Sequence, residues 1–454
     1  MIYLSKLSIE HFRGVLAKQE VTFATPRGSK GSGLTILVGP NNVGKSTIVE
    51  ALRHAVSPPS IIDRKERHID RALRISITDT ANGFREITNP GLGANITSAG
   101  RAHPAVQQLR YIPSRRSWAH RTGTHSMEMG DYWVQRTANS KHEDSHLVSR
   151  LNAFPPEEKA AYQSELRQLA PQLLDWKIEY SDGQTYLEYV TINGNTHTAD
   201  LFGDGIASLF RIVLALYDPQ ESFVIIDEPE LSLHPQAQKR LAKYIAEKAA
   251  HRQIVLCTHS PYFVNWNDLA EGAIIYRLKQ DREGIQLNRL SVSTISLLNR
   301  LTTDWQKPQL LDAVAKEVFF ADEALFLEGQ EDVSLIGKFI ESENLPSLQL
   351  FGYGIGGSTN ILSFLAMADD LKIPCGAIFD RSSRSDYDRA REQFPQNLSE
   401  LLPTDDIRDK PETNGRKKVD GIFHQDGAIK PEFLDFLTGL LCEFRQYFDD
   451  RSSY

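Results

Sequence analysis

The sequence feature that most constrains the fold is a glycine-rich loop between an apolar run and a helical pattern. Residues 36–54 read ILVGPNNVGKSTIVEALRH, in which Gly39, Gly44, Lys45 and Ser46 match G-x-x-x-x-G-K-[ST]. Glycines at these positions let the backbone wrap an anion with its N–H groups, and the helix that begins near Lys45 adds a positive N-terminus. The pattern predicts a phosphate-binding loop between a strand and a helix.

The chemistry of ATP assigns roles to the residues of this loop. Lys45 is expected to reach the β- and γ-phosphates, and the Ser46 hydroxyl is expected to bind Mg²⁺. The residues that we expect to surround the nucleotide on this side are Gly39, Asn41, Asn42, Gly44, Lys45, Ser46 and Thr47.

Two later apolar runs, FVIIDE and QIVLCTHS, end in polar residues, which is typical of buried parallel strands whose C-terminal ends face a site. In FVIIDEPELSLHP, Asp227 stands at the strand end, where it can hold magnesium through water. Glu228 follows and is expected to orient or deprotonate the attacking water. His259, at the end of the second run, is expected to sense the γ-phosphate. The alternative for His259 is a structural role.

Composition limits the classes of function. The 454 residues correspond to two or three domains at about 150 residues each. The formal charge of −8 gives no overall positive field, so any contact with nucleic acid must come from a local basic patch. Three distant cysteines argue against a disulfide framework or a Cys-rich zinc site. Without an apolar stretch long enough for a membrane span or a signal-peptide core, we expect a cytoplasmic protein.

The nucleotide motifs resemble those of ATP-binding-cassette ATPases of the SMC-like kind. The opening LSIEHFRG is similar to that group's first strand, and DEPELSLHP to its Walker B and D-loop. In place of the Ser-Gly-Gly-Gln signature of transporters, the chain has LFGDGIASLFRIVLAL. The resemblance implies that Gly203, Gly205 and Ser208 cap the nucleotide of an opposite subunit in a homodimer. The alternative is an ordinary strand-to-helix turn.

A second strand–helix alternation begins after about residue 300 and carries acidic residues at strand ends. ALFLEGQED ends an apolar run on Glu328, with Asp332 four residues later, and CGAIFDRSS ends another on Asp380. Carboxylates at neighbouring strand ends suit Mg²⁺. Two such ions can clamp the attacking and leaving oxygens of a phosphodiester.

These segments resemble a Toprim domain. The similarity lies in EVFFADEALFLEGQED, GIGGSTN and IFDRSS. An SMC-like ATPase followed by Toprim is the layout of the overcoming-lysogenization-defect (OLD) family of phage-defence nucleases. The resemblance implies an α/β fold, with an ABC-type P-loop ATPase domain over residues 1–305 and a smaller Toprim-like domain over residues 318–454. The implied cofactors are ATP and Mg²⁺, with Mn²⁺ as an alternative ion at the Toprim site.

The resemblance also assigns chemistry to the site residues. The residues expected to act in catalysis are Glu228, His259, Glu328 and Asp380. The residues expected to bind metal are Ser46, Asp227, Glu328, Asp332 and Asp380.

One strand end departs from the Toprim pattern. The usual Asp-x-Asp is replaced by Asp380-Arg381-Ser382, and a serine cannot supply the second carboxylate. Asp386 and Asp388 lie close downstream as substitutes. The late lysine of the family has candidates only in Lys417 and Lys418, for which solvated surface charges are the alternative.

An arginine-rich stretch is the best candidate for nucleic-acid contact. No acidic residue occurs from residue 87 to residue 127, and LRYIPSRRSW places Arg110, Arg115 and Arg116 around two aromatic residues. Arginine beside aromatics suits phosphate contact and base stacking. Pairing of these arginines with acidic residues elsewhere in the fold is the alternative.

Three functions remain open from the sequence. The first is an ATP-regulated endonuclease of the OLD type, cutting nucleic acid during phage infection. The second is an ATPase sensor or scaffold in a multi-component antiphage system, resembling PARIS or a retron-associated system, whose inactive Toprim domain holds a separate effector. The third is a DNA-repair loader without nuclease activity, which leaves LFLEGQED unexplained.

Overall fold

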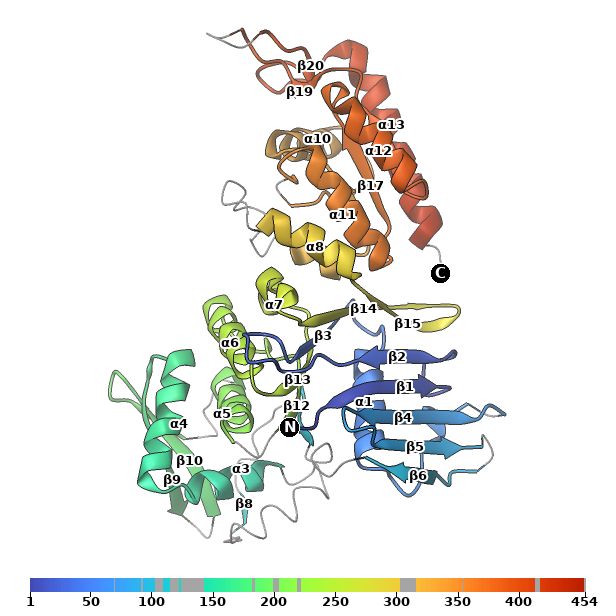
Figure 1. Ribbon diagram of the computed structural model, residues 1–454. Coiled ribbons are helices and arrows are strands. Elements are labelled where there is room, and N and C mark those ends of the chain that lie inside the picture. Colours follow the sequence, from blue (N-terminus) through green and yellow to red (C-terminus); the bar gives the residue numbers. More distant parts are fainter. Residues whose placement is uncertain are drawn as a thin grey trace.

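The computed structural model describes residues 1–68, 70–90, 93–102, 109–114, 122–123, 143–181, 184–198, 204–218, 222–302, 316–352, 354–412 and 417–452. The N-terminal part, up to residue 302, and the C-terminal part, from residue 316, are stacked on each other (Figure 1). Both parts combine strands with helices, as the sequence predicts.

The N-terminal part is built on a six-stranded sheet in the order β15-β14-β3-β13-β12-β7. All neighbours in it are parallel except β15, which is antiparallel to β14. Its strands are β3 (Leu34–Val38), β7 (Leu109–Ile112), β12 (Phe223–Asp227), β13 (Gln253–Cys257), β14 (Ile274–Asp281) and β15 (Gly284–Arg289). Every residue of β3, β12 and β13 is buried, which explains their continuous apolar runs, because both faces of the sheet are covered.

One face of this sheet packs on α1 (Lys45–Val56) and a five-stranded antiparallel sheet. That sheet has the order β2-β1-β4-β5-β6. Its strands are β1 (Leu4–Glu10), β2 (Gln19–Thr22), β4 (Leu73–Asp79), β5 (Phe84–Asn89) and β6 (Thr97–Arg101). Leu37, Ile225 and Val255 share a core with Ile48 and Leu52 of α1. The helix that follows the glycine-rich loop is therefore held between two sheets.

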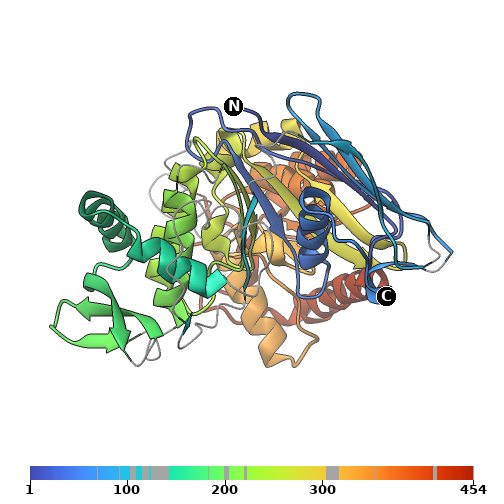
Figure 2. The ribbon, with the colours of Figure 1, turned by 90° about the horizontal axis from the view of Figure 1, so that it is seen from below.

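The other face packs on α5 (Asp204–Tyr217) and α6 (Pro235–Lys248). Beyond them a segment projects on the side opposite to the antiparallel sheet (green in Figures 1 and 2). Its elements are α3 (Glu143–Asn152), α4 (Pro156–Leu169), β8 (Thr122–Gly123), β9 (Leu173–Ser181), β10 (Gln184–Thr191) and β11 (Thr196–Thr198). The sequence pattern predicts helix to residue 174, but α4 ends at Leu169, because Pro171 has no N–H to continue it.

The C-terminal part contains a parallel three-stranded sheet in the order β16-β17-β18. Its strands are β16 (Ala324–Phe326), β17 (Cys375–Phe379) and β18 (Leu398–Leu401), and the short strands β19 (Asp406–Arg408) and β20 (Gly421–Phe423) pair separately. The helices here are α10 (Gln330–Ser342), α11 (Ser358–Asp370), α12 (Arg384–Gln393) and α13 (Leu434–Ser452).

The two parts share one continuous hydrophobic core. Ile275 of β14 and Phe364 of α11 belong to the same cluster of buried residues. The connection between the parts runs through α7 (Trp266–Ala270), α8 (Val292–Thr302) and the short helix η7 (Glu317–Phe320). The rings of Trp266 and Phe319 meet there with centroids 5.2 Å apart.

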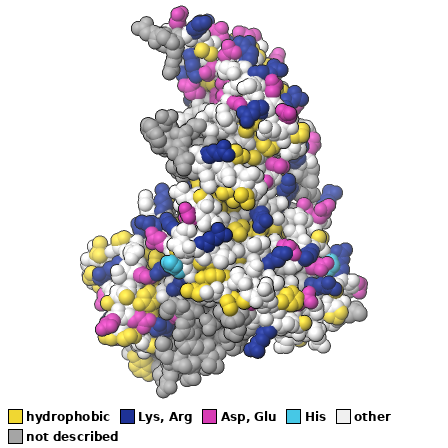
Figure 3. Space-filling view, in the orientation of Figure 1, with side chains coloured by type: hydrophobic (Ala, Val, Ile, Leu, Met, Phe, Trp, Pro, Cys, Tyr) yellow, Lys and Arg dark blue, Asp and Glu magenta, His cyan; other side chains and the backbone are white. Residues whose placement is uncertain are grey.

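Charged side chains of both signs are interspersed over the face drawn in Figure 3. Among the residues that the structure describes, no helix has the length and apolar character that crossing a membrane requires.

Candidate functional sites

The glycine-rich loop runs from the end of β3 to the first turn of α1. Gly39 and Gly44 have φ angles of 142° and 99°, which favour glycine. A Cβ on Gly39 would lie 2.6 Å from the Leu278 carbonyl oxygen, and one on Gly44 would lie 2.2 Å from Cδ1 of Ile285. Both glycines are therefore required by backbone conformation and by close contact with the β14–β15 hairpin.

The polar side chains of the loop differ in their burial and in their hydrogen bonds. The Lys45 ammonium donates to the Gly39 carbonyl at 2.9 Å and to the Pro40 carbonyl at 2.8 Å. Burial lowers its pKa, while neighbouring carboxylates, among them Asp227, act in the opposite direction. Ser46 is exposed in the first turn of α1, and Thr47 is buried. The remaining predicted residues of the loop are the exposed Asn41 and Asn42.

The ends of β12 and β13 bring the acidic residues and the histidine together. These strands pair in parallel, and the Glu228 N–H donates to the Cys257 carbonyl at 2.8 Å. The His259 Nε2 lies 3.7 Å from the Glu228 Oε1. Burial and the positive charge of Lys45 lower the pKa of His259, so its imidazole is neutral near pH 7. A neutral imidazole can donate a hydrogen bond to a phosphate without adding charge.

Asp227 has a contact that the motif does not predict. The Tyr111 hydroxyl on β7 lies 3.5 Å from the Asp227 Oδ2, to which it donates. The guanidinium of Arg53 on α1 lies 4.5 Å from the centroid of the Tyr111 ring. Burial raises the pKa of Tyr111, so the phenol keeps its proton and remains a donor.

Glu230 is a site residue that sequence reasoning missed. Its Oε1 accepts from the His259 backbone N–H at 2.6 Å, and its Oε2 accepts from the Thr258 hydroxyl at 2.9 Å. It therefore fixes the end of β13 to the loop after β12. The sequence indicates Glu230 only through its place in the segment PELSLHP. Its contact with His259 joins the ends of two strands that are separated in the chain, so it cannot be predicted from a continuous motif.

The first turn of α5 lies against the loop after β12. A Cβ on Gly205 would lie 2.4 Å from the carbonyl oxygen of Ser232. Gly205 and Ser208 are both buried, with Ser208 2% exposed. Gly203 lies outside the described residues. The capping of a second subunit's nucleotide by these residues stays a prediction.

In the C-terminal part, the parallel pairing of β16 and β17 brings Glu328 and Asp380 together. The Glu328 Oε1 accepts from the Asp380 N–H at 2.9 Å, and its Oε2 accepts from the Ser383 hydroxyl at 3.1 Å. Burial raises the pKa of Glu328, and the carboxylates of Asp386 and Asp406 act in the same direction.

The raised pKa values of Asp332 and Asp380 indicate a crowded acidic site. Asp332, in the first turn of α10, accepts from the Gly329 N–H at 2.6 Å. Burial and the charges of Glu328 and Asp406 raise its pKa to about 7. Burial, with the charges of Asp332, Glu328 and Asp406, raises the pKa of Asp380 to about 9. Asp406, at the start of β19, is thus a fourth acidic member that sequence reasoning missed.

The two substitutes considered for the missing carboxylate have other partners. Asp386 accepts from the Ser358 hydroxyl at 2.7 Å and from Arg389 at 3.1 Å. Asp388 is exposed and pairs with Arg384 at 3.3 Å. The structure therefore offers Asp406, from a different strand, as the additional carboxylate. We call Glu328, Asp332, Asp380 and Asp406 the acidic cluster.

The lysine at the acidic cluster is Lys410. Its ammonium pairs with the Asp406 carboxylate, lies 3.8 Å from the Glu331 carboxylate, and opposes the rise in the pKa of Asp332. By contrast, Lys418 pairs with Asp420 at 2.9 Å on the surface, and Lys417 is exposed. The sequence does not single out Lys410 because it follows a short strand without a recognisable pattern.

The acidic cluster fits a hard divalent cation by its chemistry. Its ligands are carboxylate oxygens, and the raised pKa of Asp380 reflects burial and the repulsion of neighbouring carboxylates, both of which a cation would offset. No three carboxylates of the cluster have ligand atoms all within 4.8 Å of one another.

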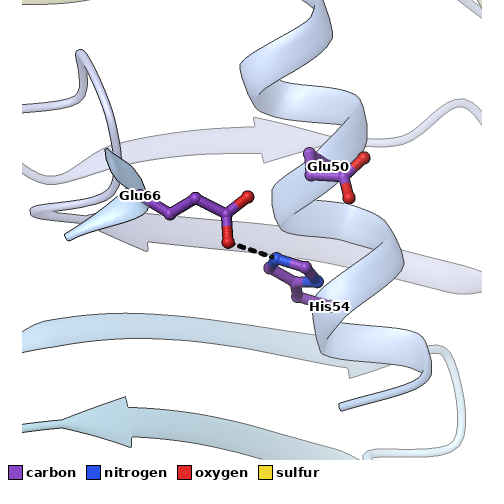
Figure 4. A group of neighbouring side chains, drawn as sticks. All are labelled: Glu50, His54 and Glu66. Carbon is purple, nitrogen blue, oxygen red and sulfur yellow. Dashed lines mark hydrogen bonds and ion pairs between the residues drawn. The ribbon is translucent and has the colours of Figure 1, made fainter. Parts of the chain in front are cut away.

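Among the described residues, only Glu50, His54 and Glu66 have ligand atoms all within 4.8 Å (Figure 4). The His54 Nε2 lies 3.4 Å from one Glu66 oxygen. The other Glu66 oxygen pairs with Arg13 at 2.5 Å, and Glu50 pairs with Arg53 at 2.8 Å. Because each carboxylate already has a guanidinium partner, we assign this group a structural role that holds α1 to the segment around Glu66.

Family models match along most of the chain. An "AAA domain" model matches residues 6–111, and a model described as "AAA domain, putative AbiEii toxin, Type IV TA system" matches residues 124–265. The model "Overcoming lysogenization defect protein-like, TOPRIM domain" matches residues 319–381, which include Glu328, Asp332 and Asp380. Two AAA-domain models and one OLD-like Toprim model thus lie in order along the chain.

The chain is also similar to parts of known proteins. The chain is 28% identical over 220 residues to the "OLD nuclease" of Thermus scotoductus, and this match covers 45% of this chain and 41% of that protein. An uncharacterized protein of Methanocaldococcus jannaschii is 22% identical over 167 residues, covering 36% of this chain and 19% of that one. The chain thus spans less than half the length of the curated relatives it matches. The Smc head domain of Pyrococcus furiosus has a TM-score of 0.46 and 12% identity, covering 66% of this chain and all of that one.

Of the arginines proposed to contact nucleic acid, Arg115 and Arg116 lie outside the described residues. Arg110 lies in β7, next to Tyr111, in register with Val224 of β12. β7 is an edge strand of the six-stranded sheet, and Arg110 lies two residues before its last residue.

Proposed function

We propose that this chain is an ATP-hydrolysing OLD-like endonuclease that acts in antiphage defence in the cytoplasm, and that closure of an ATP-bound dimer controls a Mg²⁺-dependent Toprim site. The observation that carries the proposal is the acidic cluster, joined in one chain to a P-loop and a Walker B strand. A chain that only binds and hydrolyses ATP has no need of four crowded carboxylates in a second part of the fold.

At the ATP site, the chain's own residues bind, orient and move a proton. Lys45 would exchange its bonds to the loop carbonyls for bonds to the phosphates, and Ser46 and Asp227 would hold the magnesium ion, which would neutralise phosphate charge. Glu228 accepts a proton from the attacking water, and the neutral His259, anchored by Glu230, donates to the γ-phosphate.

At the Toprim site, bound Mg²⁺ would supply charge neutralisation at the attacking and leaving oxygens of a phosphodiester. Glu328, Asp332, Asp380 and Asp406 would hold it. The Asp380 N–H and the Ser383 hydroxyl orient the Glu328 carboxylate, and Lys410 orients that of Asp406. These contacts hold the oxygens in place and lower the cost of organising the site when the ion binds.

Dimer closure would bury two ATP molecules, each between the P-loop of one subunit and the first turn of α5 of the other. The nucleic acid would be bound by a local basic stretch that includes Arg110, Arg115 and Arg116, because the whole chain carries a net negative charge.

The experiment that tests the proposal is a nicking assay with supercoiled plasmid, Mg²⁺ or Mn²⁺, and the purified full chain, with and without ATP. Metal-dependent nicking whose rate changes with ATP is the expected result. ATP hydrolysis without nicking of plasmid or of an RNA substrate would reject the nuclease assignment.

One observation favours a second function. Ser382 replaces the usual second aspartate, and its position is exposed beside Asp380. If Asp406 does not compensate, the Toprim domain would hold a separate effector in a multi-component antiphage system, and the ATPase would act as its sensor. Pull-down of the tagged chain from its native host during infection, with ATP hydrolysis intact and no nicking, distinguishes this function.

A further inference from the structure

The buried side chain of Arg277 connects the ATPase and Toprim parts. Arg277 lies in β14 of the ATPase sheet and is 3% exposed. Its Nη2 donates to the Ala321 carbonyl at 2.7 Å, and its Nη1 donates to the Leu371 carbonyl at 3.5 Å. Both acceptors belong to the C-terminal part. A buried guanidinium is costly unless such bonds satisfy it, so these carbonyls determine where it lies.

On the nucleotide side, Arg277 lies beside the P-loop. It is in register with Val38, the last residue of β3 before the loop. The next residue, Leu278, has its carbonyl oxygen 2.6 Å from where a Cβ on Gly39 would stand, so the loop backbone rests directly on β14. The Gly39 carbonyl also accepts from Lys45, a bond that must break when the ammonium reaches a phosphate. A change at Gly39 therefore acts on the backbone next to Arg277.

On the Toprim side, the acceptor Leu371 is the C-terminal cap of α11. A positive charge is favourable at this end of a helix, because the last carbonyls and the helix dipole are negative there. At the other end of α11, the Gly357 N–H donates to the Glu328 backbone carbonyl at 2.9 Å, and the Ser358 hydroxyl donates to the Asp386 carboxylate at 2.7 Å. One helix thus spans from Arg277 to the segment that carries Glu328.

We propose that Arg277 is a positioning residue that couples the nucleotide state of the P-loop to the acidic cluster through α11. The coupling rests on the proposed function, because it requires that ATP binds at the P-loop. ATP binding shifts β14 at Leu278, the Arg277 guanidinium carries this shift to the end of α11, and the far end of α11 moves the segment around Glu328. The residue touches neither ATP nor the acidic cluster.

Hydrogen–deuterium exchange of the full chain tests this coupling without requiring nuclease activity. The background variant is Glu228→Gln, so that bound ATP persists. Peptides over residues 39–48 report nucleotide binding, and peptides over residues 354–363 report the start of α11. We expect ATP with Mg²⁺ to slow exchange in both regions by about fivefold or more, the lower end of ordinary allosteric coupling. In Arg277→Met the change at residues 39–48 remains, and the change at residues 354–363 is lost.

Asp370→Asn is the matched control. The Asp370 carboxylate accepts from the Ser291 N–H at 2.8 Å, so it joins the same end of α11 to the ATPase part through a residue outside β14. This variant is expected to keep the response at residues 354–363. Equal loss of response in Asp370→Asn and Arg277→Met would mean a general loosening of the interface and would overturn the role of Arg277.

The remaining outcomes are also decisive. A response at residues 39–48 but none at residues 354–363 in the background variant overturns the coupling and leaves the ATPase intact. No response to ATP in either region rejects the proposed function and the coupling with it. If Arg277→Met melts too early for exchange measurements, Arg277→Lys replaces it. Lysine cannot bridge both carbonyls as a planar guanidinium does, so a full response in that variant overturns the proposal.

Discussion

The carboxylate of Glu328 accepts a hydrogen bond from the backbone N–H of Asp380 at 2.9 Å. This bond joins the ends of β16 and β17, two strands that lie next to each other in the sheet but are separated by α10 and α11 in the chain. It orients one acidic side chain by the backbone of another. Because the two residues are positioned together, a change at Glu328 should disturb the metal site without disturbing the distant P-loop.

We therefore expect Glu328→Ala to lower metal-dependent cutting by roughly 100-fold or more, because it removes a metal ligand and its orienting bonds. ATP hydrolysis should remain within about twofold of the wild type. Plasmid nicking and phosphate release, measured on the same preparation, check both parts. The control is Asp388→Ala, since Asp388 is exposed and pairs with the exposed Arg384, so its loss should leave nicking unchanged. Equal activity of Glu328→Ala and wild type would remove Glu328 from the site.

Asp406 and its neighbour Asp405 offer a matched comparison. Asp406 raises the pKa of Asp332 and Asp380, whereas Asp405 is exposed and pairs with Arg381 at 2.7 Å. Asp406→Asn should weaken Mn²⁺ binding about tenfold or more, since it removes one carboxylate of the acidic cluster. Asp405→Asn should bind Mn²⁺ as the wild type does. Titration calorimetry without nucleotide measures both, and identical affinities in the two variants would exclude Asp406 as a ligand.

Ser382→Asp restores the usual spacing of two aspartates after β17. The position is exposed, so the larger side chain meets no packed core. We expect Mn²⁺ affinity to rise about tenfold and nicking to increase, because the added carboxylate increases the charge of the ligand set. Ser382→Asn, with a similar volume and no charge, is the control. Unchanged affinity in Ser382→Asp would mean that position 382 points away from the ion.

The pKa values of Asp332 and Asp380 predict how stability depends on pH. Their folded-state values, about 7 and about 9, lie above the usual range, so the proton binds more tightly to the folded chain than to the unfolded chain. The stability that this tighter binding contributes is present below about pH 4, the usual pKa of an aspartate, and is lost progressively as the pH rises to about 7 for Asp332 and about 9 for Asp380. The melting temperature in EDTA should therefore fall over this window.

Metal should reverse this loss, because a bound cation favours the ionised carboxylates. Between pH 7 and pH 9, where Asp380 still releases a proton on binding, the apparent affinity should rise by up to about tenfold per pH unit. Melting curves with EDTA and with Mn²⁺ from pH 6 to pH 9.5 check this expectation, and Asp380→Asn should flatten the dependence. The same stabilisation by Mn²⁺ at pH 6 and pH 9 would contradict it.

The sequence predicts best what is local in the chain. The P-loop and the Walker B strand are continuous segments, and the conformations of Gly39 and Gly44 follow from their motif. Glu328 and Asp380 were predicted to meet because each ends an apolar run, and parallel strands that pair bring such ends together. Predicting these features requires only the rule that the C-terminal ends of parallel strands face one edge of a sheet.

The parts that were missed depend on contacts between segments distant in the chain. Asp406 lies in β19, a strand of only three residues without an apolar run, and Lys410 follows two residues after this strand. Glu230 contacts His259 across two strand ends, and Arg277 is buried because its partners are carbonyls of another part of the chain. From the sequence alone, an arginine in a strand is predicted to lie on the surface, because the carbonyls that accept its hydrogen bonds in the interior are not known.

The last prediction concerns the ATP site itself. Glu228 is held at the end of β12 by its N–H bond to Cys257, and its carboxylate lies 3.7 Å from His259. Glu228→Gln keeps the shape of the side chain but cannot accept a proton from water. Hydrolysis should fall roughly 100-fold or more while ATP still binds. In size-exclusion chromatography with ATP and Mg²⁺, this variant should elute as a dimer, because the closed state persists. Lys45→Ala should bind no ATP and stay in the nucleotide-free form. A Glu228→Gln protein whose elution does not change with ATP would contradict dimer closure, and undiminished hydrolysis would remove Glu228 as the base.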